Sequence, residues 1–179
     1  MRDVILEARS LLEDTTPLHT DCGQVCDGRC CKASQGREGM LLFPGEEGLY
    51  KNTDFQLKTT QGGTLLTCDG HCDRSDRPLA CRIFPLFPHV DANGRVRAVY
   101  DPRGYSLCPL VFEAAHVPLQ RAFVRAVRRA GRILMRDAAC AAFLREQSEE
   151  IDELLRLTPL CEVRAPIKRR KISEKQGAR

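Results

Sequence analysis

The sequence predicts an α+β protein: a small cysteine-rich, metal-stabilised domain of short strands, hairpins and helices, followed by a C-terminal helical hairpin. Three observations lead to this prediction. Apolar residues recur at helical spacing near both ends of the chain, short β-like runs separated by turn residues occupy the middle, and ten cysteines lie mostly within the first 110 residues. The length of 179 residues suits one domain with an appendage.

Helices are predicted in three places. The segment 2–14 has an apolar face that consists of Val4, Ile5, Ala8, Leu11 and Leu12. From Pro118 onward, apolar residues again follow helical spacing: Leu119, Ala122, Phe123, Ala126, Val127, Ala130, Ile133 and Leu134. Asp137 is a good N-cap for a second helix, which we expect to run to about Leu157.

Extended segments are predicted between these helical regions. Met40–Phe43 is a short apolar run that suits a strand, and the Pro and acids at 44–47 suit the start of a short helix. Two hairpins are predicted from turn residues. They pair 54–58 with 64–68 around Gln61-Gly62-Gly63, and 83–90 with 95–100 around Asp91-Ala92-Asn93-Gly94.

The texture of the sequence divides the chain into three parts. We expect a cysteine-cluster metal-binding domain at 1–116, a helical hairpin at 117–160 and a basic, flexible tail at 161–179. The net charge of +4 comes from the tail, where residues 163–179 hold seven lysines and arginines and one acid. Such a tail would attract nucleic acid or an acidic protein partner.

The ten cysteines indicate either disulfides in an oxidising compartment or metal ligands in a reducing one. The first 16 residues do not resemble a secretory signal peptide, because Asp3, Glu7 and Glu13 interrupt the apolar positions. No segment has the roughly 18 apolar residues of a membrane span. We therefore expect a cytoplasmic protein with reduced thiols and no membrane association.

Eight cysteines form two groups, which are Cys22, Cys26, Cys30 and Cys31, and then Cys68, Cys72, Cys81 and Cys108. A tetrahedral ion takes ligands that lie close together, and residues three or four apart on a turn supply two thiolates at once. Cys22 and Cys26 would share a helix face, and Gly28 would let the chain curl back toward them. The eight thiols match two four-thiolate sites, or one site assembled across both groups.

Zinc is the expected metal, and iron or an iron–sulfur cluster is the alternative, since four thiolates suit either. Buried core thiols and reversible disulfides are the competing interpretations, but the adjacent Cys30 and Cys31 have polar neighbours. His71 would replace a thiolate in another ligand set. Basic residues near the cysteines would donate hydrogen bonds to the thiolates: Arg29, Lys32, Arg37, Arg74, Arg77 and Arg82.

The segment Arg77-Pro78-Leu79-Ala80-Cys81-Arg82-Ile83-Phe84-Pro85 resembles the RP-x-x-CR-x-x-P signature of the YkgJ-like cysteine-cluster family, described as a zinc- or iron-chelating domain. The first cysteine group resembles the family's tight C-C-C-CC group. This resemblance covers roughly residues 20–110 and implies metal binding through Cys22, Cys26, Cys30, Cys31, Cys68, Cys72, Cys81 and Cys108. The family spaces its middle cysteines more widely than Cys68 and Cys72. Its relation to proteins implicated in flagellin lysine methylation suggests, as an alternative, an iron–sulfur protein with redox or methyl-transfer activity.

Arginines form a stripe on the helix predicted from Pro118, at Arg121, Arg125, Arg128 and Arg132. The stripe would bind nucleic-acid phosphates. The favoured interpretation is that the acids of the next helix lie opposite these arginines in an antiparallel hairpin. Those acids are Glu146, Glu149, Glu150, Asp152 and Glu153.

The remaining candidates have simpler explanations. Glu46 would act as a base beside a metal, but a first-turn helix acid is the favoured reading. Cys140 lies in an alanine-rich helical stretch and is expected in the core, and Cys161 has no cysteine close by in sequence. Dinucleotide-binding, P-loop and nucleophile-elbow motifs are absent from the sequence, so no motif names an enzyme.

Overall fold

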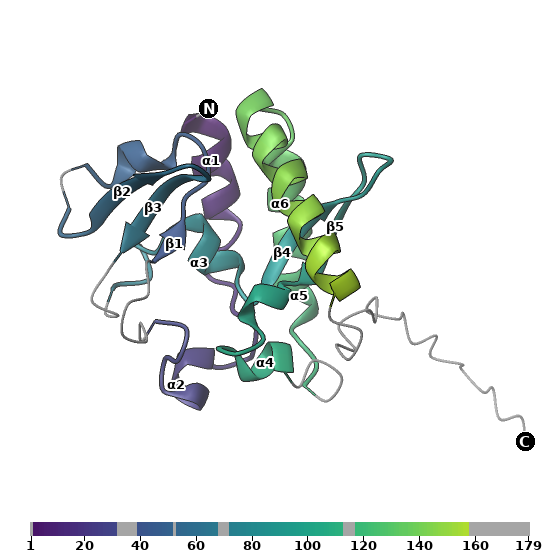
Figure 1. Ribbon diagram of the computed structural model, residues 1–179. Helices are drawn as coiled ribbons and strands as arrows, with labels where there is room; N and C mark the ends of the chain where they lie inside the picture. The colour runs from purple at the N-terminus through teal and green to yellow at the C-terminus, as the bar shows by residue number, and fades with distance from the viewer. Residues whose placement is uncertain (1, 32–38, 52, 68–71, 113–116, 158–179) are drawn as a thin grey trace, which may run out of the picture.

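The computed structural model describes residues 2–31, 39–51, 53–67, 72–112 and 117–157 (Figure 1). Over these ranges the chain forms six α-helices, two 3-10 helices and five strands in two antiparallel sheets. The protein is therefore an α+β protein, as the sequence predicts. None of the helices in these ranges has both the length and the apolar composition needed to cross a bilayer. Regular structure is present in two of the three predicted parts, at 1–116 and at 117–160. The third part, the predicted basic tail, lies outside the described residues.

Helix α1 (Arg2–Ser10) is the predicted N-terminal helix. Its apolar face is confirmed, because Ile5, Ala8 and Leu12 are fully buried. The helix is shorter than predicted because the chain tightens at its end. The amide of Leu12 donates to the carbonyl of Arg9 at 3.0 Å, a three-residue turn that replaces the α-helical pattern.

Both predicted hairpins are present. Strands β2 (Gln56–Thr60) and β3 (Gly63–Thr67) form the first, and β1 (Met40–Leu41) pairs with the other edge of β3. Strands β4 (Leu86–Val90) and β5 (Val96–Tyr100) form the second, with Leu86 opposite Tyr100. The second hairpin begins later than predicted, because residues 79–83 are helical.

Several short helices were not predicted, because a single turn is too short to show a hydrophobic period. They are α3 (Leu79–Ile83), α4 (Pro109–Phe112) and the 3-10 helix η2 (Pro102–Gly104). Helix α2 (Cys22–Cys26) agrees with the expectation that Cys22 and Cys26 share a helix face. The 3-10 helix η1 (Glu46–Leu49) begins where the proline and acids at 44–47 predict a short helix. Cys22 and Cys26 lie on α2, Cys81 lies on α3, and Cys108 immediately precedes α4.

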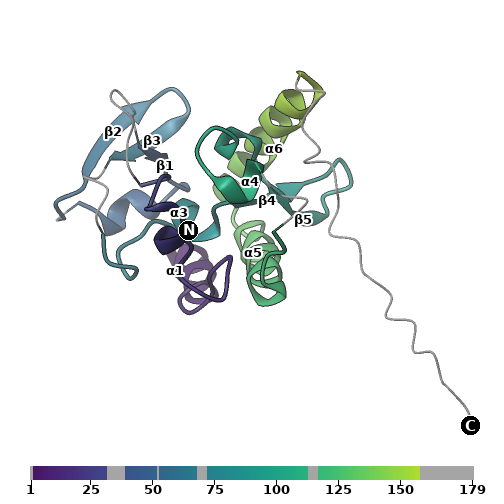
Figure 2. The ribbon, with the colours of Figure 1, turned by 90° about the horizontal axis from the view of Figure 1, so that it is seen from below.

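The two long C-terminal helices, α5 (Arg121–Leu134) and α6 (Ala138–Leu157), are present as predicted. Asp137 caps α6, since its Oδ1 accepts from the amides of Ala139 and Cys140 at 3.0 and 3.1 Å. The two helices lie on opposite sides of the β4–β5 hairpin, as Figures 1 and 2 show from two directions. One hydrophobic core joins the hairpin to both helices and to α1.

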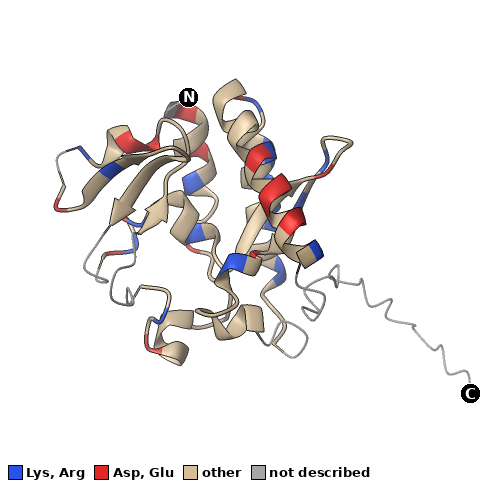
Figure 3. Cartoon of the chain, in the orientation of Figure 1, with Lys and Arg blue, Asp and Glu red and all other residues tan. Residues whose placement is uncertain are grey.

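The prediction that the acids of α6 lie opposite the arginines of α5 is wrong. Glu150 instead approaches Arg103 at 3.3 Å, and Asp152 contacts His89 at 3.0 Å. Figure 3 shows the acidic residues along α6, on the outer side of that helix. The physical reason is that each helix packs its apolar side on its own face of the hairpin, so their charged sides point apart.

Candidate metal centre

Helix α2 presents two cysteines one turn apart. Asp21 caps the helix, because its Oδ1 accepts from the amide of Gly23 at 3.1 Å. The helix ends at Cys26, since Asp27 (φ 54°) and Gly28 (φ 61°) both adopt the left-handed conformation. The amide of Cys31 then donates to the carbonyl of Gly28 at 2.7 Å. The reversal predicted at Gly28 is thus present, and it turns the chain immediately before the next two cysteines.

The sulfur atoms of Cys30 and Cys31 are 4.0 Å apart. Two thiolates bound to one tetrahedral zinc lie about 3.8 Å apart, given zinc–sulfur bonds of about 2.3 Å. The hydrogen bond with Cys31, followed by burial, raises the pKa of the Cys30 thiol, and the charges of Cys22 and Cys26 act in the same direction. The four cysteines of the first group therefore share one electrostatic neighbourhood.

Cys108 belongs to this neighbourhood, although it lies some 80 residues further along the chain. Burial raises the pKa of the Cys108 thiol, and the charge of Cys26 adds to the increase. Burial also raises the pKa of Cys22 to about 11, with further contributions from Asp21, Cys26 and Cys108. Cys108 immediately precedes α4 and is a buried member of the hydrophobic core, against which Cys22 also packs. Sequence order alone had placed it with the second group.

Arg77 connects the two cysteine groups. Burial lowers its pKa, but a hydrogen bond to Cys72 and the charges of Cys72, Cys31 and Asp21 outweigh this and raise it. Its Nε is buried and has no hydrogen-bond acceptor among the described residues. A half-buried guanidinium whose Nε can still donate a hydrogen bond is a favourable neighbour for an anionic thiolate–metal centre. Asp21 caps α2, and its charge helps to raise the pKa of Arg77. The sequence analysis missed this residue, although an Asp immediately before a helical turn is an N-cap signal.

Two other arginines that were predicted to serve the thiolates have structural roles instead. Arg74 donates to the carbonyls of Leu12 and Glu13 at 3.0 and 2.6 Å. Arg82 is buried and its Nη1 contacts Glu13 Oε2 at 2.6 Å. Both side chains connect the segment 74–82 to the chain at the end of α1. Arg74 donates hydrogen bonds to backbone carbonyls there, and Arg82 forms an ion pair with the Glu13 carboxylate. Arg29 is exposed, and Lys32 and Arg37 lie outside the described residues.

The second cysteine group is only partly described. Cys72 is half-buried beside Arg77, and Cys81 is half-buried on α3. Cys68, His71 and Cys161 lie outside the described residues. Among the described cysteines, Cys22, Cys26, Cys30, Cys108 and Cys140 are free thiols. Within the same ranges, no three His, Cys, Asp or Glu side chains are gathered closely enough to hold a metal ion.

Glu46 and Cys140 are structural residues. Glu46 is fully buried and accepts from Arg9 Nη1 at 2.9 Å and from the amide of Leu79 at 2.6 Å, so its oxygens are engaged within the protein. Cys140 is fully buried, and burial raises the pKa of its thiol to about 12. The predictions of a helix-start acid and a core thiol are confirmed.

Comparisons of this chain with protein-family models, with curated proteins and with solved structures found no match. The interpretation of the cysteine neighbourhood therefore rests on its own residues.

Proposed function

We propose that this chain is a cytoplasmic metal-binding protein whose cysteine thiolates hold zinc and thereby order the loops that carry them. The observation that supports the proposal is the 4.0 Å separation of the Cys30 and Cys31 sulfur atoms on the turn after α2. Cys22 and Cys26 lie within electrostatic reach of that pair, and Cys108 lies within electrostatic reach of Cys22 and Cys26. Cysteines at this density in a reducing compartment are metal ligands more often than inert core residues.

The donor set fits a four-thiolate centre. Cys22, Cys26 and Cys108 together with Cys30 or Cys31 would hold one ion, and Cys68, Cys72 and Cys81 would contribute to a second. Zinc in such a site supplies folding free energy rather than redox chemistry. Metal binding replaces the thiol protons, so the sulfurs are expected to draw together only when the ion binds.

The proposal is tested by elemental analysis and absorbance of protein purified anaerobically without added metal. We expect colourless protein with stoichiometric zinc. Cys26→Ser and Cys108→Ser should each remove the same equivalent, and the pair together should remove no more than either alone. Cys26→Ser combined with Cys81→Ser should remove a second equivalent if the groups form separate sites.

Cys140→Ser is the matched control, because Cys140 lies in the core away from α2 and should leave the metal content unchanged. If the protein is brown and contains iron and sulfide, the same thiols hold an iron–sulfur cluster instead of a zinc ion. Protein without any stoichiometric transition metal would overturn the proposal.

A further inference from the structure

The solvent side of α5 is a row of arginines. The helix contains five arginines and no acidic residue. All five are exposed, and they are Arg121, Arg125, Arg128, Arg129 and Arg132. The opposite side of the helix buries Phe123, Val127 and Ala130 in the core. Four of the arginines follow the i, i+4, i+7, i+11 pattern, so they form a stripe about 16 Å long.

These arginines are not neutralised by the acids around them. Among the described residues, no acidic side chain forms an ion pair with any of the five. Glu7 of the neighbouring α1 is paired with Arg136 at 2.6 Å, and Asp91 of the hairpin is paired with Arg97 at 3.2 Å. The stripe therefore keeps its full positive charge.

The charge pattern opposes the stability of the helix. Like charges four residues apart, such as Arg121 and Arg125 or Arg128 and Arg132, repel each other along the stripe. Arg121 also places a cation in the first turn, where the helix dipole favours an anion. An external polyanion would relieve both penalties, whereas water only screens them.

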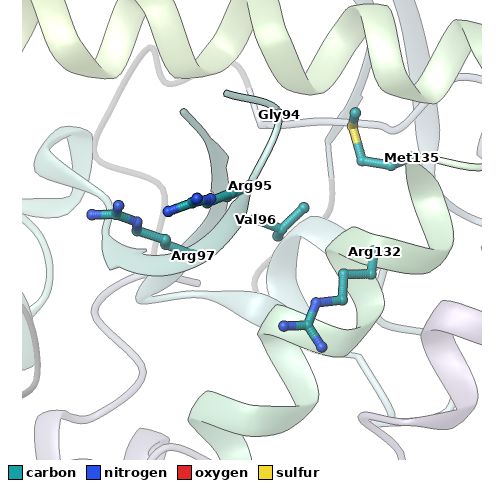
Figure 4. Close-up of a pocket in the computed structure, with 6 residues that line it drawn as sticks. All are labelled: Gly94, Arg95, Val96, Arg97, Arg132 and Met135. Atoms are coloured by element: carbon teal, nitrogen blue, oxygen red, sulfur yellow. The ribbon is translucent and has the colours of Figure 1, made fainter. Parts of the chain in front are cut away.

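The stripe continues into a hollow beside the β4–β5 hairpin (Figure 4). The hollow has a volume of about 470 Å³, and its basic lining residues are Arg132 of α5 and Arg95 and Arg97 of the hairpin. Gly131 allows the helix to approach this closely, because a Cβ there would lie 2.5 Å from Pro88 Cβ and 2.7 Å from Val96 Cγ1. Two elements thus present arginines to one surface.

We propose that this surface, formed by the α5 arginines and Arg95, binds the phosphate backbone of double-stranded nucleic acid. Guanidinium groups bind phosphates strongly and through paired donors. Single-stranded binders stack bases on exposed aromatic rings, and no large apolar side chain of α5 or the hairpin is exposed. The same lack of apolar side chains disfavours insertion into an anionic membrane surface.

The experiment measures binding of the full-length protein to a 16-base-pair duplex, in DNA and RNA forms, as a function of salt concentration. Simultaneous replacement of Arg121, Arg125 and Arg128 by Glu should weaken duplex binding at 0.1 M salt by about 100-fold or more. The slope of log K against log salt should fall in magnitude by about 2.7, since each phosphate contact contributes about 0.9.

Three controls separate this surface from other causes. Replacement of the same three arginines by Lys should retain binding, because the charge remains. Arg145→Glu with Arg156→Glu makes a similar charge change on exposed positions of α6 and should have little effect. Replacement of Lys168, Arg169, Arg170 and Lys171 by Gln measures the contribution of the tail to duplex binding separately from that of α5.

Circular dichroism and metal content should be unchanged in the Glu variant, so a loss of binding would not reflect misfolding or loss of the cysteine site. The proposal is overturned if the wild-type protein shows no salt-dependent duplex binding, if the Glu variant binds as well as wild type, or if phosphatidylserine vesicles or single strands are bound in preference to the duplex.

Discussion

Glu46 connects three segments that are distant in sequence. Its carboxylate accepts from Arg9 of α1, from the first amide of α3 and, at 3.4 Å, from the amide of Phe43. The same carboxylate is fully buried. A buried charge of this kind is tolerated only while its partners remain in place, so each partner becomes sensitive to its loss.

We expect Glu46→Ala to lower the free energy of unfolding by about 3–5 kcal/mol, because it leaves the Arg9 charge and the Leu79 amide without their acceptor. Glu46→Gln should cost less, since an amide oxygen still accepts from Leu79. Urea denaturation measures both. Glu47→Ala is the control, and a cost for Glu47 equal to that for Glu46 would contradict this role.

Tyr50 is the second partner of Arg9, whose Nη1 donates to the phenol oxygen at 2.6 Å. Burial and the charge of Glu46 raise the pKa of Tyr50 to about 12, although Arg9 acts in the opposite direction. The fold thus favours the neutral phenol. This stabilisation is complete below the ordinary tyrosine pKa of about 10 and is lost as pH rises toward 12.

Absorbance titration at tyrosinate wavelengths measures this directly. Tyr50→Phe should remove the ionisation step near pH 12, and the variant should show less loss of unfolding free energy between pH 10 and 12 than wild type. If Tyr50→Phe instead removed a step near pH 10, the phenol would be in contact with water and not held by this network.

At the scale of elements, the packing of α5 on the β4–β5 hairpin depends on one residue without a side chain. Gly131 of α5 faces Pro88 of β4 and Val96 of β5, and the side chains of both strand residues are buried. A glycine within a helix normally lowers stability by up to about 1 kcal/mol relative to alanine. Its presence here indicates that the close packing of α5 on the hairpin contributes more to stability than alanine's higher helix propensity would.

Gly131→Ala should therefore destabilise the protein, by about 1–3 kcal/mol, even though alanine is the better helix former. Thermal unfolding measures the change. Gly48→Ala is the matched control, because a Cβ at Gly48 meets no atom within 4 Å and should change stability little. A stabilised Gly131→Ala variant would show that the helix and hairpin can move apart without cost.

The short helices show where sequence periodicity stops being informative. Helix α3 has five residues, of which Leu79 and Ile83 are buried, and this spacing also fits an extended run. The chain becomes helical there because Pro78 can only begin a helix and Arg82 reaches back to Glu13 of the N-terminal segment. That second contact is tertiary, so the sequence analysis did not predict this helix and assigned its last residue, Ile83, to the strand that follows.

At the scale of the whole molecule, the larger of the two hydrophobic cores in the described residues forms without any buried metal ligand from α2. The core cluster includes residues of α1, α5, α6 and the β4–β5 hairpin. The cysteine-bearing α2 contains no buried residue. If metal stabilises this protein, it should therefore do so locally, at the end of the molecule that carries α2 and α4.

Hydrogen–deuterium exchange with and without a strong chelator tests this expectation. Chelation should speed exchange in residues 21–31 and 104–112 and leave the amides of α5 and α6 within error of their original rates. The melting temperature should fall modestly. Identical exchange with and without chelator, over residues 21–31 in particular, would contradict metal-dependent order.

The sequence by itself determined the fold class, the two long C-terminal helices, both hairpins and the burial of Cys140, because long periodic segments and turn residues encode local structure directly. Tertiary structure decided which distant groups meet. It brought Cys108 within electrostatic reach of Cys22 and Cys26 and Arg77 within electrostatic reach of Cys31 and Cys72. It assigned Arg74 and Arg82 to the end of α1. It also left the α5 arginines without an acidic partner among the described residues, since α5 and α6 pack on opposite faces of one hairpin. These outcomes depend on contacts between residues far apart in the chain, which no local pattern specifies.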